Sequence, residues 1–137
     1  MFKRYPRREW GSFFRFGYRI TRWGLHVSFV DSIEPRPGEL KRGSGIVEFD
    51  AGYILRAQLA LAETKLGTGV IHSHPQGCGT FASRLDDDMD GYFSREFADY
   101  GEGRPYVSLR VARDAGGSFS FTGEAWLNGE QMPVTEW

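Results

Sequence analysis

The chain has 137 residues, of which 40% are hydrophobic and 26% are charged, and its formal net charge is −1. This composition indicates one soluble globular domain and excludes a bulk electrostatic attraction to nucleic acid or membranes. The only cysteine, Cys78, excludes a disulfide within the chain. The sequence contains neither a membrane-spanning run nor a signal-peptide core, so we expect a cytoplasmic protein.

The first 23 residues are rich in arginine and in aromatic side chains. Such a segment could bind nucleic acid, with cations for phosphates and rings for bases. The alternative is a half-buried strand, in which apolar side chains face the core and arginines face outward. The alternation that supports it covers Phe14, Arg15, Phe16, Gly17, Tyr18, Arg19 and Ile20. This period of two favours the strand, and we do not expect a nucleic-acid partner.

A second strand follows the turn at Trp23 and Gly24, because Leu25, Val27 and Phe29 again alternate with other residues. It predicts a hairpin with the first strand. His26 has the opposite parity from this apolar set, so we expect it to face solvent.

The middle of the chain predicts a strand, a helix and another strand. Residues 34–39 form a Pro- and Gly-containing loop, residues 45–49 a short strand, and Asp50 a helix N-cap. Apolar residues at three- and four-residue steps predict a helix over 51–66, ended by Gly67. A strand over 69–74 follows, and the two strands of such a unit are usually parallel.

The second half predicts a helix and a β-meander. A glycine-rich loop over 76–82 leads into a helix from about Ser83 to Tyr100, with Asp87, Asp88 and Asp90 on a solvated face. Three strands follow over 106–111, 119–127 and 132–137, and Asn128-Gly129 suits a tight hairpin turn. The whole pattern is that of a mixed α/β fold, with a sheet flanked by helices.

His72 and His74 are two of the three histidines in the chain. On a strand, residues two apart point to the same face, so both imidazoles would aim at one point. Asp86 could supply a third ligand. Two imidazoles, a carboxylate and an open position are typical of a catalytic zinc site. Ser83 and Asp86 could instead form a helix-capping pair, and Cys78 could be a ligand in place of Asp86.

The segment from His72 to Asp86 resembles the H-x-H-P-x7-S-x-x-D signature of the JAMM (JAB/MPN) metalloproteases. The matching residues are His72, His74, Pro75, Ser83 and Asp86. The family also has a glutamate just before an upstream apolar strand, and Glu9-Trp10-Gly11-Ser12-Phe13-Phe14 fits that pattern better than the contexts of Glu34, Glu48 or Glu63. A helix usually leads into this glutamate, whereas eight residues precede Glu9 here.

This resemblance implies a single JAB/MPN domain over residues 1–137 with a cytidine-deaminase-like architecture, and a Zn²⁺ held by His72, His74 and Asp86. It implies that Glu9 carries the proton of the attacking water and that Ser83 steadies the oxyanion during amide hydrolysis. Ser73 points to the opposite side of the strand, so we expect it to support the strand by a hydrogen bond.

The prokaryotic members that this chain is similar to are often associated with ThiF-like activating enzymes and ubiquitin-like modifiers. The resemblance therefore implies a zinc-dependent isopeptidase that cleaves after the C-terminus of ubiquitin or a ubiquitin-like protein. Two alternatives stay open: a phage-tail-type JAB peptidase acting on cell-wall peptides, and a non-catalytic MPN scaffold.

Overall fold

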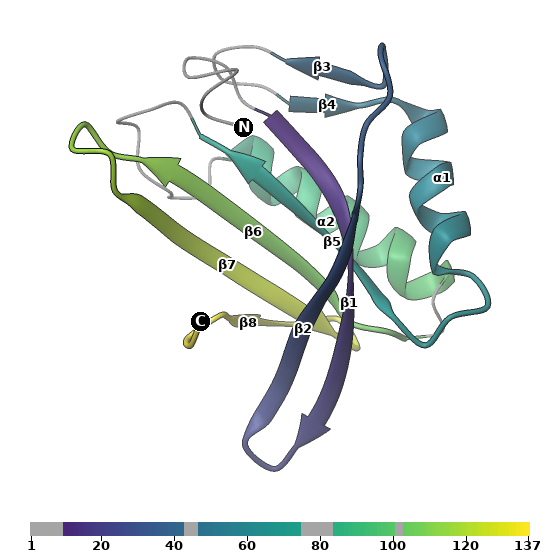
Figure 1. Cartoon of the computed structure of the whole chain (residues 1–137). Coiled ribbons are helices and arrows are strands. Elements are labelled where there is room, and N and C mark those ends of the chain that lie inside the picture. The colour runs from purple at the N-terminus through teal and green to yellow at the C-terminus, as the bar shows by residue number, and fades with distance from the viewer. Residues whose placement is uncertain (1–9, 43–46, 75–83, 101–102) are drawn as a thin grey trace.

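The computed structural model describes residues 10–42, 47–74, 84–100 and 103–137 (Figure 1). In chain order, its elements are β1 (Trp10–Thr21), β2 (Gly24–Ile33), β3 (Leu40–Arg42), β4 (Val47–Phe49), α1 (Ala51–Leu61), β5 (Gly67–Ser73), α2 (Arg84–Tyr100), β6 (Tyr106–Arg113), β7 (Phe119–Leu127) and β8 (Glu130–Pro133). The predicted mixed fold of strands and helices is confirmed. No helix in the described ranges is both long and apolar enough to cross a membrane.

The main sheet has six strands in the order β2-β1-β5-β6-β7-β8. Neighbouring strands are antiparallel except β5 and β6, which are parallel and are joined through α2. The prediction that the strands flanking α1 would form a parallel pair is wrong. β4 pairs instead with β3 in a separate two-stranded sheet, because β1 occupies the free edge of β5.

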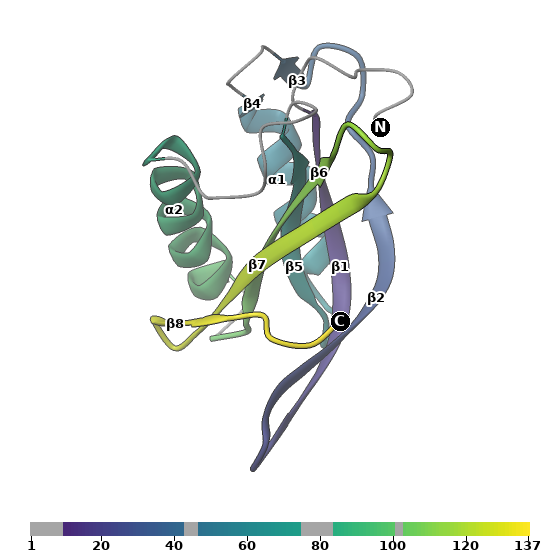
Figure 2. The ribbon, with the colours of Figure 1, turned by 90° about the vertical axis from the view of Figure 1, so that its left-hand side faces the viewer.

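Both helices lie on the same side of the main sheet, as Figures 1 and 2 show. The core between these layers is largely aromatic. The ring of Phe13 lies 4.8 Å from that of Tyr53 on α1 and 5.3 Å from that of Phe93 on α2. The Tyr53 hydroxyl also accepts the Phe13 N–H and donates to the Ile33 carbonyl. Helix α1 is therefore fixed to both strands of the N-terminal hairpin.

Asp50 caps α1 as predicted, since its Oδ2 accepts the Gly52 N–H at 2.9 Å. The predicted end of the helix near residue 66 is wrong. α1 ends at Leu61, and Glu63 takes a left-handed conformation with φ 63° that a helix cannot continue through. Gly67 begins β5 and lies against the Phe16 ring, where any side chain would overlap.

The N-terminal hairpin is confirmed, and so is the alternation of its first strand. Phe14 and Phe16 are buried on the side of the sheet opposite the helices. Arg15 does not face outward as expected. It lies on the helix side, where its Nε donates to Asp31 at 2.8 Å and its Nη1 donates to the Ala60 carbonyl of α1. A salt bridge and a helix end thus hold this arginine beneath α1.

The C-terminal β-meander is confirmed, although its last strand ends at Pro133 and not at Trp137. The turn at Asn128 and Gly129 has positive φ at both residues, 53° and 79°, as a tight hairpin turn requires. Beyond β8, the Val134 N–H donates to the Gly123 carbonyl, so the tail continues along β7.

Candidate metal centre

His72 lies near the end of β5 and His74 directly after it, with their imidazoles directed to one point. Residue 72 faces the helix side of the sheet, and the Nε2 atoms of the two rings are 3.2 Å apart. His72 is completely buried and His74 is 7% exposed. Buried imidazoles that face each other so closely require either a shared proton or a shared cation.

Asp86 lies in the first turn of α2 and completes the cluster. Its Oδ1 is 3.0 Å from His72 Nε2, and its Oδ2 is 3.3 Å from His74 Nε2. One ligand atom from each residue lies within 4.8 Å of the others. The crossover from β5 to the start of α2 brings the carboxylate to the two histidines.

The donor set and its spacing fit a metal ion. Zinc binds imidazole nitrogen and carboxylate oxygen at about 2.0–2.2 Å, which places tetrahedral ligands roughly 3.3 Å from one another. The separations of 3.0 to 3.3 Å among these atoms are close to that value. A buried His-His-Asp group of this geometry could hold a metal ion.

The outer nitrogen of His72 has no hydrogen-bond partner in the part of the chain that the structure describes. Nδ1 is buried, whereas Nε2 faces His74 and Asp86. A metal-binding histidine usually donates its second N–H to an outer acceptor. In this site the ring is held by burial and by its contacts with His74 and Asp86.

Ser73 lies between the histidines in the chain and points the other way. Its Oγ accepts the backbone N–H of Trp10 at 2.9 Å. This bond joins the first residue of β1 to the last residue of β5, where Gly11 also pairs with His72. The beginning of β1 is thereby anchored directly beside the two histidines.

Three residues that the sequence singled out, Glu9, Ser83 and Cys78, lie outside the described residues. His26 lies away from the cluster, on the exposed hairpin, with its Nε2 3.0 Å from Thr21 Oγ1. Of the predicted site, the structure brings together His72, His74 and Asp86.

The expectation for the acidic face of α2 is partly wrong. Asp87 and Asp88 are exposed, but Asp90 is 1% exposed. Asp90 lies one helical turn after Asp86, so it shares the inward face of α2. Its Oδ1 accepts the Tyr106 hydroxyl at 3.0 Å, and its Oδ2 is 3.9 Å from Arg110 Nη1.

Arg110 was not predicted as part of the site. It is 2% exposed and is the neighbour of His72 in the parallel pairing of β5 and β6. Its Nη2 donates to Glu124 at 2.6 Å and its Nε donates to Thr122 at 3.2 Å. The alternation of side chains along β6 could have indicated this position. Residues 106, 108 and 110 face the same side of the sheet as residue 72 once β5 and β6 pair.

Burial raises the pKa of Asp90 to about 6. The hydroxyls of Ser108 and Tyr106 and the electrostatic influence of His72 and Arg110 oppose this rise. Burial lowers the pKa of Arg110, but the bond to Glu124 and the charges of Glu124, Asp90 and Asp86 outweigh it, so the net shift is upward. Asp90 and Arg110 are therefore coupled electrostatically to His72 and Asp86.

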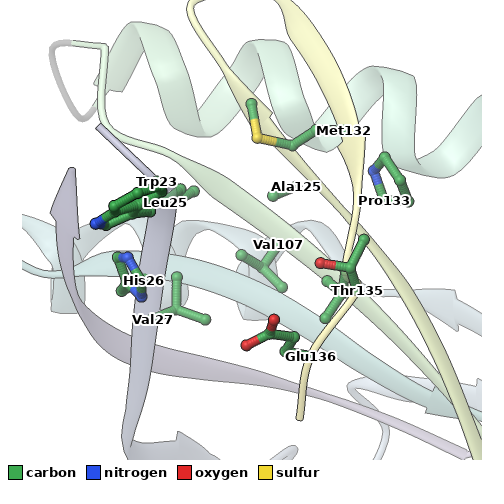
Figure 3. A pocket seen from close by; sticks show the side chains of 11 residues that line it. Trp23, Leu25, His26, Val27, Val107, Ala125, Met132, Pro133, Thr135 and Glu136 are labelled. Carbon is green, nitrogen blue, oxygen red and sulfur yellow. The ribbon is translucent and has the colours of Figure 1, made fainter. Parts of the chain in front are cut away.

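A cavity of about 290 Å³ lies elsewhere, on the side of the sheet opposite the helices (Figure 3). It is lined by Trp23 of the turn between β1 and β2 and by residues of β2, β6, β7, β8 and the C-terminal tail, including Val107 and Met132. None of the candidate metal ligands lines it. The cavity and the candidate metal centre are therefore separate sites in the fold.

A comparison with protein-family models finds no match, and neither does a comparison with curated proteins.

Proposed function

We propose that this protein is a metal-dependent peptidase or isopeptidase that cleaves after the C-terminus of ubiquitin or a ubiquitin-like protein. The observation that carries the proposal is the convergence of His72, His74 and Asp86 in a buried cluster with ligand spacing. The resemblance of the segment around it to the JAMM signature supports the choice of reaction. The donor set favours zinc, and the JAB/MPN architecture belongs to the same proposal.

His72, His74 and Asp86 would hold the ion. Three protein ligands leave a position for water or substrate, and zinc in such a site supplies Lewis acidity and lowers the pKa of bound water. By its place in the motif, Glu9 would accept a proton from the attacking water and deliver it to the leaving amine. Ser83 would donate a hydrogen bond to the oxyanion. The Trp10–Ser73 bond supports Glu9 in this role, because it fixes the residue that follows Glu9 beside the histidines.

The substrate class and the pathway come from the same resemblance. A ThiF-like activating enzyme would join the modifier that this protein removes, and a cytoplasmic location would suit both. The complete ligand triad favours an enzyme over a non-catalytic scaffold, because a scaffold has no need for three converging buried ligands.

The experiment is cleavage of a ubiquitin-like protein fused at its C-terminal glycine to a reporter, by the full chain supplied with zinc. We expect cleavage at the junction, its loss on chelation, and its loss in His72→Ala and in Glu9→Gln. Glu9→Gln should still bind zinc. Zinc binding without cleavage by the wild type would support a scaffold instead.

A further inference from the structure

A network of buried charges lies next to the candidate metal centre. It consists of Asp90 on α2, Arg110 on β6 and Glu124 on β7, and we call it the Arg110 network. Arg110 is the central member, with Glu124 2.6 Å from its Nη2 and Asp90 3.9 Å from its Nη1. Asp90 and Arg110 are almost fully buried, while the side chain of Glu124 is 23% exposed.

Burying the charges of Asp90 and Arg110 requires compensation, because each would cost several kcal/mol in a low-dielectric interior. One guanidinium faces two carboxylates, so the Arg110 network carries one net negative charge. An uncompensated buried negative charge is unfavourable unless a cation is nearby. The network on its own is therefore unbalanced.

The metal centre has the opposite imbalance. Two neutral imidazoles and the Asp86 carboxylate contribute a single negative charge, so a bound divalent cation would leave one positive charge. Arg110 and His72 are direct neighbours on adjacent strands, and Asp90 follows Asp86 by one helical turn. The net negative charge of the Arg110 network and the net positive charge of the metal-loaded centre would therefore lie side by side.

We propose that the Arg110 network balances the charge of the metal-loaded centre and thereby sets its affinity for the ion, with Arg110 as a positioning residue. This inference depends on metal binding at His72, His74 and Asp86 as proposed above. Arg110 holds the two carboxylates in fixed places and reduces their combined charge. Without it, the centre would bind a divalent cation more tightly than in the wild type.

The experiment measures the zinc affinity of the full chain by competition with a chelator. Asp90→Asn and Glu124→Gln each remove a negative charge and keep the side-chain shape, and we expect each to weaken binding roughly 10- to 100-fold. Arg110→Gln removes the positive charge and should strengthen binding. A general loss of structure cannot produce shifts of opposite sign.

If Arg110→Gln does not fold, the double variant Arg110→Gln/Glu124→Gln decides the matter. It keeps the net charge of the network, so its zinc affinity should return toward the wild-type value from that of Glu124→Gln alone. Glu39→Gln, which breaks a carboxylate–guanidinium pair with Arg56 of α1, is the control and should leave zinc affinity unchanged.

Equal zinc affinity in all variants, or weaker binding in Arg110→Gln as well as in Asp90→Asn, would overturn this inference and leave the proposed function standing. A wild type that binds no zinc would overturn both. The visible spectrum of the cobalt-substituted protein provides a second readout, since it reports the ligand field directly. It should keep the same coordination geometry in all of these variants.

Discussion

Oδ1 of Asp86 lies 3.0 Å from Nε2 of His72, although the two residues belong to a helix and to the strand before it. We expect Asp86→Asn to weaken zinc binding by more than the roughly 10- to 100-fold that losing an outer hydrogen-bond partner costs. Asp87→Asn is a matched control, because Asp87 is exposed in the same turn of α2. Equal losses of zinc affinity in the two variants would contradict the assignment of Asp86 as a ligand.

The bond from the Trp10 N–H to Ser73 Oγ predicts an effect on both stability and activity. Ser73→Ala leaves a partly buried backbone N–H without its acceptor, so the free energy of unfolding should fall by about 1–3 kcal/mol. The cleavage rate should fall by more than the loss of folded protein accounts for, because Trp10, the residue after Glu9, loses its hydrogen bond to Ser73. Denaturant melts and cleavage rates provide the measurement. Ser28→Ala, at an exposed position of β2, should change neither quantity.

The raised pKa of Asp90 should make the stability of the metal-free protein depend on pH. Its pKa is about 6 when folded, above the ordinary 3.8, so the folded state binds a proton more readily than the unfolded state. The contribution of Asp90 to stability is therefore unfavourable above pH 6 and improves as the pH falls from 6 toward 4. The full change is about 3 kcal/mol, since each pKa unit corresponds to about 1.4 kcal/mol.

Urea unfolding of the wild type and of Asp90→Asn at pH 4, 5, 6 and 7 tests this pH dependence. The wild type should gain stability relative to the variant as the pH falls. The comparison removes the contributions of groups that both proteins share, including His72 and His74. A difference in unfolding free energy that does not vary with pH would show that the pKa of Asp90 is the same in the folded and unfolded states.

Replacing Gly67 by alanine should cause a packing defect away from the candidate metal centre. A methyl group there would overlap the Phe16 ring, so Gly67→Ala should lower the free energy of unfolding by about 1–3 kcal/mol. In Gly91→Ala, the added methyl group would lie 3.6 Å from the Arg95 guanidinium, in ordinary contact, and should stabilise α2 by up to about 1 kcal/mol. Thermal melts of both variants separate the two effects. An unchanged free energy of unfolding in Gly67→Ala would show that the Phe16 ring can move to make room for the methyl group.

Local patterns predicted much of the fold. The period-two alternation identified β1 and β2, and Asn128-Gly129 identified the turn between β7 and β8. The predicted end of α1 was wrong, because Glu63 takes a left-handed conformation. Glutamate generally favours helices, so the sequence does not indicate this break. The predicted partner strand of β4 was also wrong. Strand pairing depends on which strand edges the rest of the sheet leaves free.

The His72, His74 and Asp86 cluster was predictable for the same local reason as the strands. Two histidines two residues apart in an extended segment share one face, and the aspartate follows at the start of the next helix. Asp90 was misplaced on a solvated face because neighbouring aspartates suggest exposure. Its burial depends on Tyr106 and Arg110, which contact it only after β6 packs under α2.

Zinc content of the purified chain is the most direct test of the central claim that His72, His74 and Asp86 form a metal centre. The wild type, saturated with zinc and freed of excess, should retain one ion per chain, and His72→Ala should retain none while keeping its fold. A wild type that retains no zinc, or equal zinc in the two proteins, would contradict the claim.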